Sequence, residues 1–318
     1  MKTLGVGAFG RVKLVKHKGT GLPYALKCMR KGQIVQMKQV AHVCNEKDLL
    51  DMCDHPFILG LVGHMQDDRE IYMLFELVLG GELFSELDKR KSFDFPSTRF
   101  YSACVASALS YLHERQICYR DLKPENLLFD ADGYIKLVDF GFAKIVEDRT
   151  WTLCGTPDYM SPEVISYKGH NGSVDWWAFG ILVYEMLVGK APFSAHEPME
   201  TFRNVLNMEL LFPFLFPAEA KLLIEATLDR NPIQRLGSLG LGALDVIEHE
   251  FFGELSFAEL ERRTMPAPFI PNVMSPYDGN NYDDYPVEDG TRQPDEEEQE
   301  QLAYYETFNT DKSLFNTF

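Results

Sequence analysis

A glycine-rich turn close to the start of the chain restricts the possible folds more than any other feature. Gly5, Gly7 and Gly10 follow the pattern G-x-G-x-x-G within MKTLGVGAFGRV. Glycines at this spacing allow backbone N–H groups to approach phosphate oxygens closely. A dinucleotide-binding fold places a helix directly after the same pattern, whereas here RVKLVKH alternates as a strand does. We therefore expect a hairpin that binds phosphate, with an ordinary turn as the alternative.

The residues after this hairpin predict a small β-rich lobe. YALKCM and IYMLFELV have the composition of apolar strands, and residues 36–52 have the spacing of a helix. Lys27 interrupts the strand YALKCM, where an ammonium group is costly to bury without a counter-charge. We expect Lys27 to hold phosphates while it pairs with Glu46 on the next helix; an edge residue that reaches solvent is the alternative.

From about residue 80 the pattern is mostly helical and predicts a second, larger lobe. STRFYSACVASALSYLHERQ has the pattern of a long amphipathic helix, with Ser92 or Ser97 as the expected N-cap. Helices continue to about residue 250, and a Pro-rich, acidic tail that we expect to be extended follows. The predicted fold class is α+β with two lobes. The expected domains are an N-terminal lobe over residues 1–78, a C-terminal lobe over 79–255 and a tail over 256–318. Because only four residues precede Gly5, we also expect a further segment before Met1.

The charge of the chain is acidic and unevenly distributed. The formal net charge is −17, and residues 278–318 contain twelve acids but only two bases. Such a surface disfavours nucleic acid as a partner and favours basic protein segments. The run Asp289–Gln301 is expected to be a solvated, partly disordered tail.

The cysteines and the hydropathy restrict the environment of the protein. The six cysteines are scattered without a CxxC pair, which argues against a zinc site and indicates a reducing, cytoplasmic or nuclear compartment. No apolar run reaches the length of a transmembrane segment, so none is expected.

A dense polar run, YRDLKPEN, occupies Tyr119–Asn126 and returns at once to the apolar LLF. Thirteen residues after Asn126 comes the triplet DFG, which begins at Asp139, and SPE follows at Ser161–Glu163. Each segment alone could be an ordinary loop. Together, and in this order after the glycine turn and Lys27, they match the protein-kinase patterns H-R-D-L-x-x-x-N and D-F-G, with Tyr in place of His. We therefore expect phosphoryl transfer.

The protein-kinase pattern assigns roles within these segments. Asp121 would orient a substrate hydroxyl and accept its proton, and Lys123 would neutralise charge on the transferred phosphate. Asn126 and Asp139 would hold Mg²⁺ against the phosphates of ATP. Phosphoryl transfer depends on positioning and charge neutralisation more than on covalent chemistry, which explains the dense polar run.

The whole chain from Gly5 onward resembles the AGC group of serine/threonine protein kinases. The stretches YRDLKPEN and RTWTLCGTPDYMSPE and the long C-terminal tail carry this resemblance. STRFYSACVASALSYLH, LGGELF, KLVDFGFAK and EPMETF resemble cGMP-dependent kinases, which we favour. VDWWAFGILVYEM and FNTF are more similar to the catalytic subunit of cAMP-dependent kinases, the alternative. The resemblance implies a cyclic-nucleotide-binding regulatory region, either before Met1 or on a separate chain.

The resemblance also implies further site residues. Thr156 would hydrogen-bond to Asp121 and Lys123, and Thr152 would be a phosphosite whose phosphate pairs with Arg120, Lys144 and His42. The residues implied to contact ATP are Gly5, Gly7, Gly10, Val12, Ala25, Lys27, Glu46, Phe75, Glu76, Val78, Leu128, Val138 and Tyr282, with hinge hydrogen bonds from the backbone of Glu76 and Val78. The residues implied to bind the substrate are Glu82, Glu125 and Glu185, which would read basic residues before the acceptor, and Leu153, Pro157 and Met160, which would form an apolar pocket after it.

Other positions support or depart from this resemblance. Arg235 would pair with Glu163, and Asp175 would steady an apolar stack that includes Tyr119 and Phe140. Phe315 and Phe318 would dock as a terminal hydrophobic motif. The departures are Ser161 for Ala, Asp158 for Glu and Pro286 for an acid.

Two other classes of protein remain as alternatives. An inactive kinase-like scaffold would be expected to lack Lys27, Asp121, Asn126 or Asp139, and all four are present. A nicotinamide-dependent oxidoreductase conflicts with the strand that follows Gly10.

Overall fold

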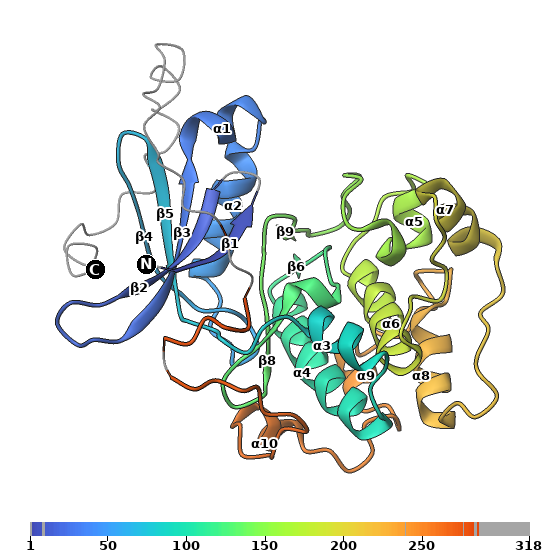
Figure 1. Cartoon of the computed structure of the whole chain (residues 1–318). Helices are drawn as coiled ribbons and strands as arrows, with labels where there is room; N and C mark the ends of the chain where they lie inside the picture. The colour runs from blue at the N-terminus through green and yellow to red at the C-terminus, as the bar shows by residue number, and fades with distance from the viewer. Residues whose placement is uncertain (1, 8–9, 239, 276, 283–284, 286–318) are drawn as a thin grey trace. The chain divides into compact units, whose positions relative to one another are not determined.

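The computed structural model describes residues 2–7, 10–238, 240–275, 277–282 and 285. The chain divides into two compact units. The first comprises Met1–Asp54, Leu59–Gly81 and Pro271–Phe318, and the second comprises His55–Ile58 and Glu82–Ile270. Figure 1 shows the first unit built around a sheet and the second built mainly of helices. This agrees with the predicted α+β class. Pro286, the acidic run Asp289–Gln301, Phe315 and Phe318 lie outside the described residues.

The first unit contains a five-stranded antiparallel sheet with the order β1-β2-β3-β5-β4. Its strands are β1 (Thr3–Gly7), β2 (Gly10–Lys16), β3 (Pro23–Arg30), β4 (Leu61–Gln66) and β5 (Glu70–Phe75). The register places Gly7 opposite Gly10 and Val12 opposite Lys27. The glycine turn therefore joins two paired strands, as its alternating flanks predicted.

Two short helices follow β3 where the sequence predicted one. They are α1 (Lys31–Gln36) and α2 (Val40–Asp51), so the single helix expected over residues 36–52 is wrong at its start. Lys38 interrupts the helical path with a φ of 56°, which is the left-handed region that does not propagate a right-handed helix. The helix α2 buries Glu46, so this carboxylate lies in the interior of the first unit.

The second unit is mainly helical. Its helices are α3 (Leu83–Arg90), α4 (Phe95–His113), α5 (Pro162–Ile165), α6 (Ser173–Val188), α7 (Pro198–Asn207), α8 (Ala218–Thr227), α9 (Ala243–Ile247) and α10 (Phe257–Glu261). Two small two-stranded sheets carry the loops of interest: β6 (Ile117–Cys118) pairs with β9 (Lys144–Ile145), and β7 (Leu127–Phe129) pairs with β8 (Ile135–Leu137). The helix α10 lies where the tail was expected to be extended, so that expectation is wrong for residues 257–261.

The N-cap of α4 differs from the prediction. The carboxylate of Asp94 accepts a hydrogen bond from the N–H of Ser97 at 2.8 Å, so neither Ser92 nor Ser97 is the cap. Pro96 occupies the first turn, where the missing N–H has no cost. The negative charge of Asp94 also interacts favourably with the positive end of the helix dipole. The cap starts α4 at Phe95 and leaves the helix to run to His113, next to the polar loop.

The described residues contain neither a disulfide nor a membrane-spanning helix. All six cysteines are free, and burial raises the pKa of the Cys28 thiol to about 11. No helix in the described part of the chain combines the length and the apolar character needed to cross a bilayer.

Candidate active site

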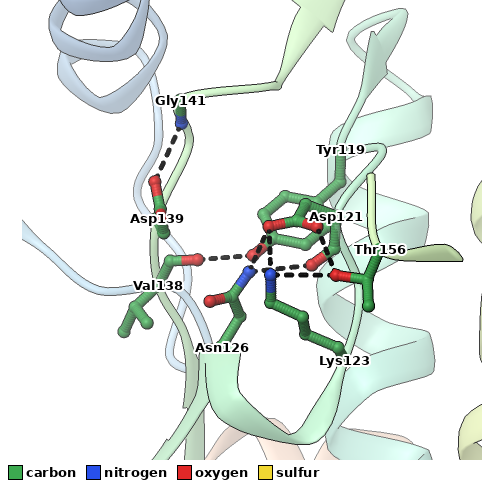
Figure 2. Close-up of polar contacts among 8 residues, drawn as sticks. All are labelled: Tyr119, Asp121, Lys123, Asn126, Val138, Asp139, Gly141 and Thr156. Atoms are coloured by element: carbon green, nitrogen blue, oxygen red, sulfur yellow. Dashed lines mark hydrogen bonds and ion pairs between the residues drawn. The ribbon is translucent and has the colours of Figure 1, made fainter. Parts of the chain in front are cut away.

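The polar run folds into a compact hydrogen-bonded loop between β6 and β7, shown in Figure 2. The side chain of Asp121 accepts hydrogen bonds from Nζ of Lys123 at 2.9 Å and from Nδ2 of Asn126 at 2.8 Å. Thr156 comes from a distant loop, and its hydroxyl donates to Asp121 at 3.4 Å and accepts from Lys123 at 3.1 Å. The structure therefore brings together four residues that were expected to act together.

Asp121 is 5 % exposed. Burial raises the pKa of its carboxyl above the ordinary range, while Lys123 and Asn126 act in the opposite direction and Asp139 adds to the rise. Each partner of Asp121 donates to the ionised form, which is the form that a general base requires. The arrangement can therefore present a carboxylate that orients a hydroxyl group and accepts its proton.

A buried carboxylate holds the backbone that leads into this loop. Asp175, which is 0 % exposed, accepts from the N–H of Tyr119 at 2.9 Å and from the N–H of Arg120 at 2.7 Å. Nε2 of His113 lies 2.7 Å from the same carboxylate. His113 was not predicted to be a site residue; its position six residues before Tyr119 was the signal that could have identified it.

Tyr119 replaces the histidine of the kinase pattern. It is fully buried, its hydroxyl donates to the carbonyl of Val138, and its ring meets that of Phe140 edge-on at 5.4 Å. The tyrosine thus connects the polar loop to the segment that carries Asp139. This contact is the part of the expected apolar stack that lies in the second unit.

Asp139 and Asn126 present oxygen atoms that suit a divalent metal. Asp139 is exposed, and within the described part of the chain its Oδ1 accepts only from the N–H of Gly141, at 3.2 Å. The Nδ2 of Asn126 donates to the backbone and the side chain of Asp121, both at 2.8 Å. Figure 2 shows the remaining amide oxygen on the side that faces Asp139. Carboxylate and amide oxygens are ligands that Mg²⁺ accepts.

These residues alone do not form a complete metal cage. The described residues contain no group of three or more His, Cys, Asp or Glu side chains that could hold a metal ion. Mg²⁺ usually binds to one or two protein groups and takes its other ligands from phosphates and water. The pair Asn126 and Asp139 fits a metal that is held jointly with a nucleotide.

The first unit contains the ion pair that was expected for the buried lysine. Nζ of Lys27 lies 2.7 Å and 2.9 Å from the two carboxylate oxygens of Glu46. The side chain of Lys27 is 26 % exposed and that of Glu46 is 6 % exposed. The carboxylate compensates the burial of the ammonium group, which stays accessible to a further anion.

The three glycines of the hairpin have different structural roles. A Cβ atom on Gly10 would lie 1.8 Å from the carbonyl oxygen of Cys28, whereas a Cβ on Gly5 or Gly7 would meet no atom within 4 Å. Gly10 therefore permits the close approach of β2 to β3. Gly5 and Gly7 leave bare backbone beside open space, which is the feature that a phosphate cradle requires.

The predicted hinge residues lie at the end of β5 and just after it. Val78 is buried, its carbonyl accepts from the Tyr282 hydroxyl at 2.7 Å, and its N–H has no hydrogen-bond partner among the described residues. The N–H of Glu76 donates to Gly60 at 3.1 Å. Tyr282 is thus placed against the hinge although 204 positions separate the two residues.

The remaining apolar residues expected at the nucleotide divide between the units. Ala25 and Phe75 face each other across β3 and β5, and Val12 lies on β2. Leu128 on β7 and Val138 belong to the second unit.

Carboxylates gather where the sequence predicted recognition of basic residues. Glu185 accepts from the hydroxyl of Tyr159. Burial raises the pKa of Glu185, the Tyr159 hydroxyl lowers it, and the nearby carboxylates of Glu125 and Asp158 raise it further. Carboxylates that repel one another in this way gain when a guanidinium group binds between them. Glu82 occupies the N-cap of α3 and forms an isolated β-bridge with Leu128.

The expected apolar pocket involves the loop that carries Thr156. Leu153 is 43 % exposed, and Pro157 begins a short 3₁₀ turn. Met160 lines a cavity of about 20 Å³ together with Asp121 and Thr156. Met160 therefore shares a cavity wall with the polar loop, whereas Leu153 and Pro157 do not line this cavity.

The proposed phosphosite is accessible. Thr152 is exposed, and Nη1 of Arg120 is buried without a hydrogen-bond partner among the described residues. Nζ of Lys144 donates to the hydroxyl of Thr150 at 3.3 Å, so a cation also lies beside the segment that carries Thr152. His42, the third expected partner of a phosphate, belongs to the first unit.

A buried ion pair secures the segment after these residues. Arg235 and Glu163 form two parallel hydrogen bonds at 2.6 Å and 2.9 Å. Burial alone would raise the pKa of Glu163, but the hydrogen bonds and the charge of Arg235 outweigh it and hold the pKa below its usual range. The pair that was predicted from the sequence is therefore formed.

Comparison with known proteins agrees with this architecture. The protein kinase domain model matches residues 1–252. The chain is 45 % identical over 294 residues to the cAMP-dependent protein kinase catalytic subunit of Dictyostelium discoideum, covering 92 % of this chain and 45 % of that protein. It is 46 % identical to cAMP-dependent protein kinase type 3 of Saccharomyces cerevisiae, covering 91 % and 73 % respectively. It is 47 % identical to cGMP-dependent protein kinase 2 of Rattus norvegicus, covering 92 % and 39 %.

The chain therefore belongs to the protein kinase family. Its relatives place it in the AGC group, near the cAMP- and cGMP-dependent enzymes. The chain spans less than half the length of the Dictyostelium and Rattus relatives. Identities of 45–47 % to both types do not separate the two.

Proposed function

We propose that this chain is an active serine/threonine protein kinase that transfers the γ-phosphate of ATP to protein hydroxyl groups. The hydrogen-bonded set of Asp121, Lys123, Asn126 and Thr156 is the observation that carries the proposal. An inactive scaffold would have no need to keep a buried carboxylate surrounded by donors that maintain its ionised form.

Each residue has a role that follows from its contacts. Asp121 orients the substrate hydroxyl and accepts its proton, and Lys123 places a positive charge beside the reacting oxygens. Lys27 holds phosphates of ATP while Glu46 positions its ammonium group. Bound Mg²⁺ would neutralise charge on the phosphates, and Asn126 and Asp139 are the residues that would hold it.

The substrates that we propose carry basic residues before the acceptor. The cluster of Glu125, Asp158 and Glu185 supports this, because burial raises the pKa of Glu185 and the neighbouring charges of Glu125 and Asp158 raise it further. Glu82 is a further candidate for the same role. Leu153, Pro157 and Met160 would accept an apolar side chain after the acceptor.

Regulation by a cyclic nucleotide is the finer part of the proposal. The motifs named above favour control by cGMP through a region before Met1, and control by cAMP through a separate subunit is the second candidate. The same proposal includes phosphorylation of Thr152. It also includes a cytoplasmic or nuclear location and lobe boundaries at residues 78 and 255.

The test is phosphorylation of a serine peptide library by the purified protein, with and without cGMP or cAMP. We expect transfer to peptides with arginine before the serine, and no transfer by the Asp139→Asn variant, which loses a metal ligand but no buried contact. An Asp139→Asn variant with wild-type turnover would refute the assignment of the site. An inactive wild-type protein with phosphorylated Thr152 would favour the scaffold.

A further inference from the structure

A cleft of about 530 Å³ lies in the second unit, away from all the residues discussed above as contacting ATP or peptide. Its walls come from the segment after α5, from α7 and from the loop after α8. The helices α5 and α7 contact each other directly, as Figure 1 shows. Nothing in the proposed phosphoryl transfer requires this cleft.

The lining of the cleft is strongly cationic. It includes Arg149, Lys168 and Arg230, and of the described residues that line it only Glu163 is acidic. Both oxygens of Glu163 are already held by Arg235, at 2.6 Å and 2.9 Å. A local excess of positive charge is therefore maintained in a protein whose formal net charge is −17.

Several hydrogen-bond donors in the cleft have no acceptor among the described residues. Arg149 and Lys168 form no side-chain hydrogen bond or ion pair with a described residue. The hydroxyl of Ser173, a residue that is 6 % exposed, is buried without a partner in the described part of the chain. The amide oxygen of Asn171 accepts from the N–H of Ser173 at 3.1 Å, which leaves its NH₂ group as a further donor.

Unused donors beside unpaired cations favour an anion with several acceptor oxygens. A phosphate monoester offers three such oxygens and a charge near −2, whereas a carboxylate offers two oxygens and a single charge. The volume exceeds that of an isolated phosphate, and Leu206 and Ile233, which are 37 % and 72 % exposed, add an apolar wall. We propose that the cleft binds a phosphorylated serine or threonine of a partner protein, followed by an apolar residue.

A natural reporter lies next to the cleft. The indole of Trp151 packs on Gly169, where a Cβ atom would lie 2.8 Å from Nε1, and Gly169 lines the cleft. Trp151 is 62 % exposed, while the other two tryptophans, Trp176 and Trp177, are 0 % exposed. A change in the emission of the exposed indole therefore reports occupation of the cleft.

The experiment is a titration of the whole chain with a short peptide in which leucine follows phosphoserine and glycines flank both. We expect a saturable change in tryptophan emission that is absent in Trp151→Phe. The double variant Arg149→Ala/Lys168→Ala should bind at least about tenfold more weakly, because each lost charge-assisted hydrogen bond is worth roughly that factor. Ser173→Ala should weaken binding to a smaller extent.

The matched control is Arg69→Ala/Lys190→Ala, which removes the same charge from exposed positions outside the cleft and should bind as the wild type does. Equal binding of the unphosphorylated peptide, unchanged binding by the Arg149→Ala/Lys168→Ala variant, or inorganic phosphate binding as tightly as the peptide would each overturn the proposal. Mass spectrometry should confirm the same modification of Thr152 in every sample.

This inference and the proposed function fail separately. Activity on basic peptides should survive in the Arg149→Ala/Lys168→Ala variant, because neither residue contacts the polar loop. Phosphopeptide binding by a wild-type protein without kinase activity would leave the cleft assigned and refute the proposed activity. Kinase activity without phosphopeptide binding would support the proposed activity and refute the assignment of the cleft.

Discussion

The buried carboxylate of Asp175 offers the sharpest test of how the active loop is held. Its two oxygens accept the backbone N–H groups of Tyr119 and Arg120 at 2.9 Å and 2.7 Å, and His113 lies at 2.7 Å from the first of these oxygens. The substitution Asp175→Asn keeps the size of the side chain and replaces one acceptor with an NH₂ donor. In either orientation of the amide, one of the two backbone N–H groups then faces a donor.

The magnitude follows from what is lost. A hydrogen bond to a charged group contributes about 1.5–3 kcal/mol, and a buried donor left unsatisfied costs about 1–3 kcal/mol. Removal of a buried charge recovers part of its desolvation penalty and offsets some of this loss. We therefore expect the free energy of unfolding to fall by about 2–4 kcal/mol. Turnover should fall as well. Arg120 immediately precedes Asp121 in the chain, so a displaced Arg120 backbone also displaces the Asp121 carboxylate.

The assay is urea denaturation of the whole chain, followed by peptide phosphorylation below the unfolding transition. Asp148→Asn is the matched control because Asp148 is exposed in the same unit; it should unfold as the wild type does, to within about 0.5 kcal/mol. If Asp175→Asn unfolded at the same urea concentration as this control, the argument that Asp175 holds the loop would be wrong.

Three further predictions follow from other contacts. Gly10→Ala should lower the free energy of unfolding by about 1–3 kcal/mol, because its Cβ would lie 1.8 Å from a backbone oxygen; Gly7→Ala is the control, and equal urea midpoints for the two variants would contradict this. Lys123→Met should move the acid limb of the kcat/KM profile to higher pH, since Lys123 lowers the pKa of Asp121 and the base must be ionised; an unmoved limb would exclude Asp121 as that base. Thr152→Ala should lower kcat severalfold, and mass spectrometry that finds unmodified Thr152 in fully active protein would show that its phosphate is not needed.

The sequence predicted contacts best where charged residues demand a partner. Lys27 in an apolar strand required a counter-charge, and Glu46 on the buried side of the next helix is that partner. The link between Arg235 and Glu163 was available only through the family resemblance, because 72 positions separate the two residues. Local chemistry identifies a residue that needs a partner, while the partner itself is a property of the tertiary structure.

The failures of prediction have local physical causes. Periodicity predicted one helix over residues 36–52, but it carries no information on the left-handed backbone of Lys38 that divides it. Ser92, Asp94 and Ser97 all have side chains suited to an N-cap, and only the observed bond from Ser97 to Asp94 selects among them.

The backbone of the active loop shows most clearly what a residue pattern leaves out. Arg120 and Asp139 adopt φ angles of 67° and 59°, in a region that costs a residue other than glycine about 1–3 kcal/mol. Arginine does not indicate such a conformation, and aspartate adopts it more readily than most residues but does not require it. The structure supplies a compensating bond at each position: the N–H of Arg120 donates to Asp175, and the carboxylate of Asp139 accepts from Gly141. The first of these acceptors is buried on a distant helix and the second bond is local, so loss of Asp175 should disturb the region of Asp121 more than that of Asp139.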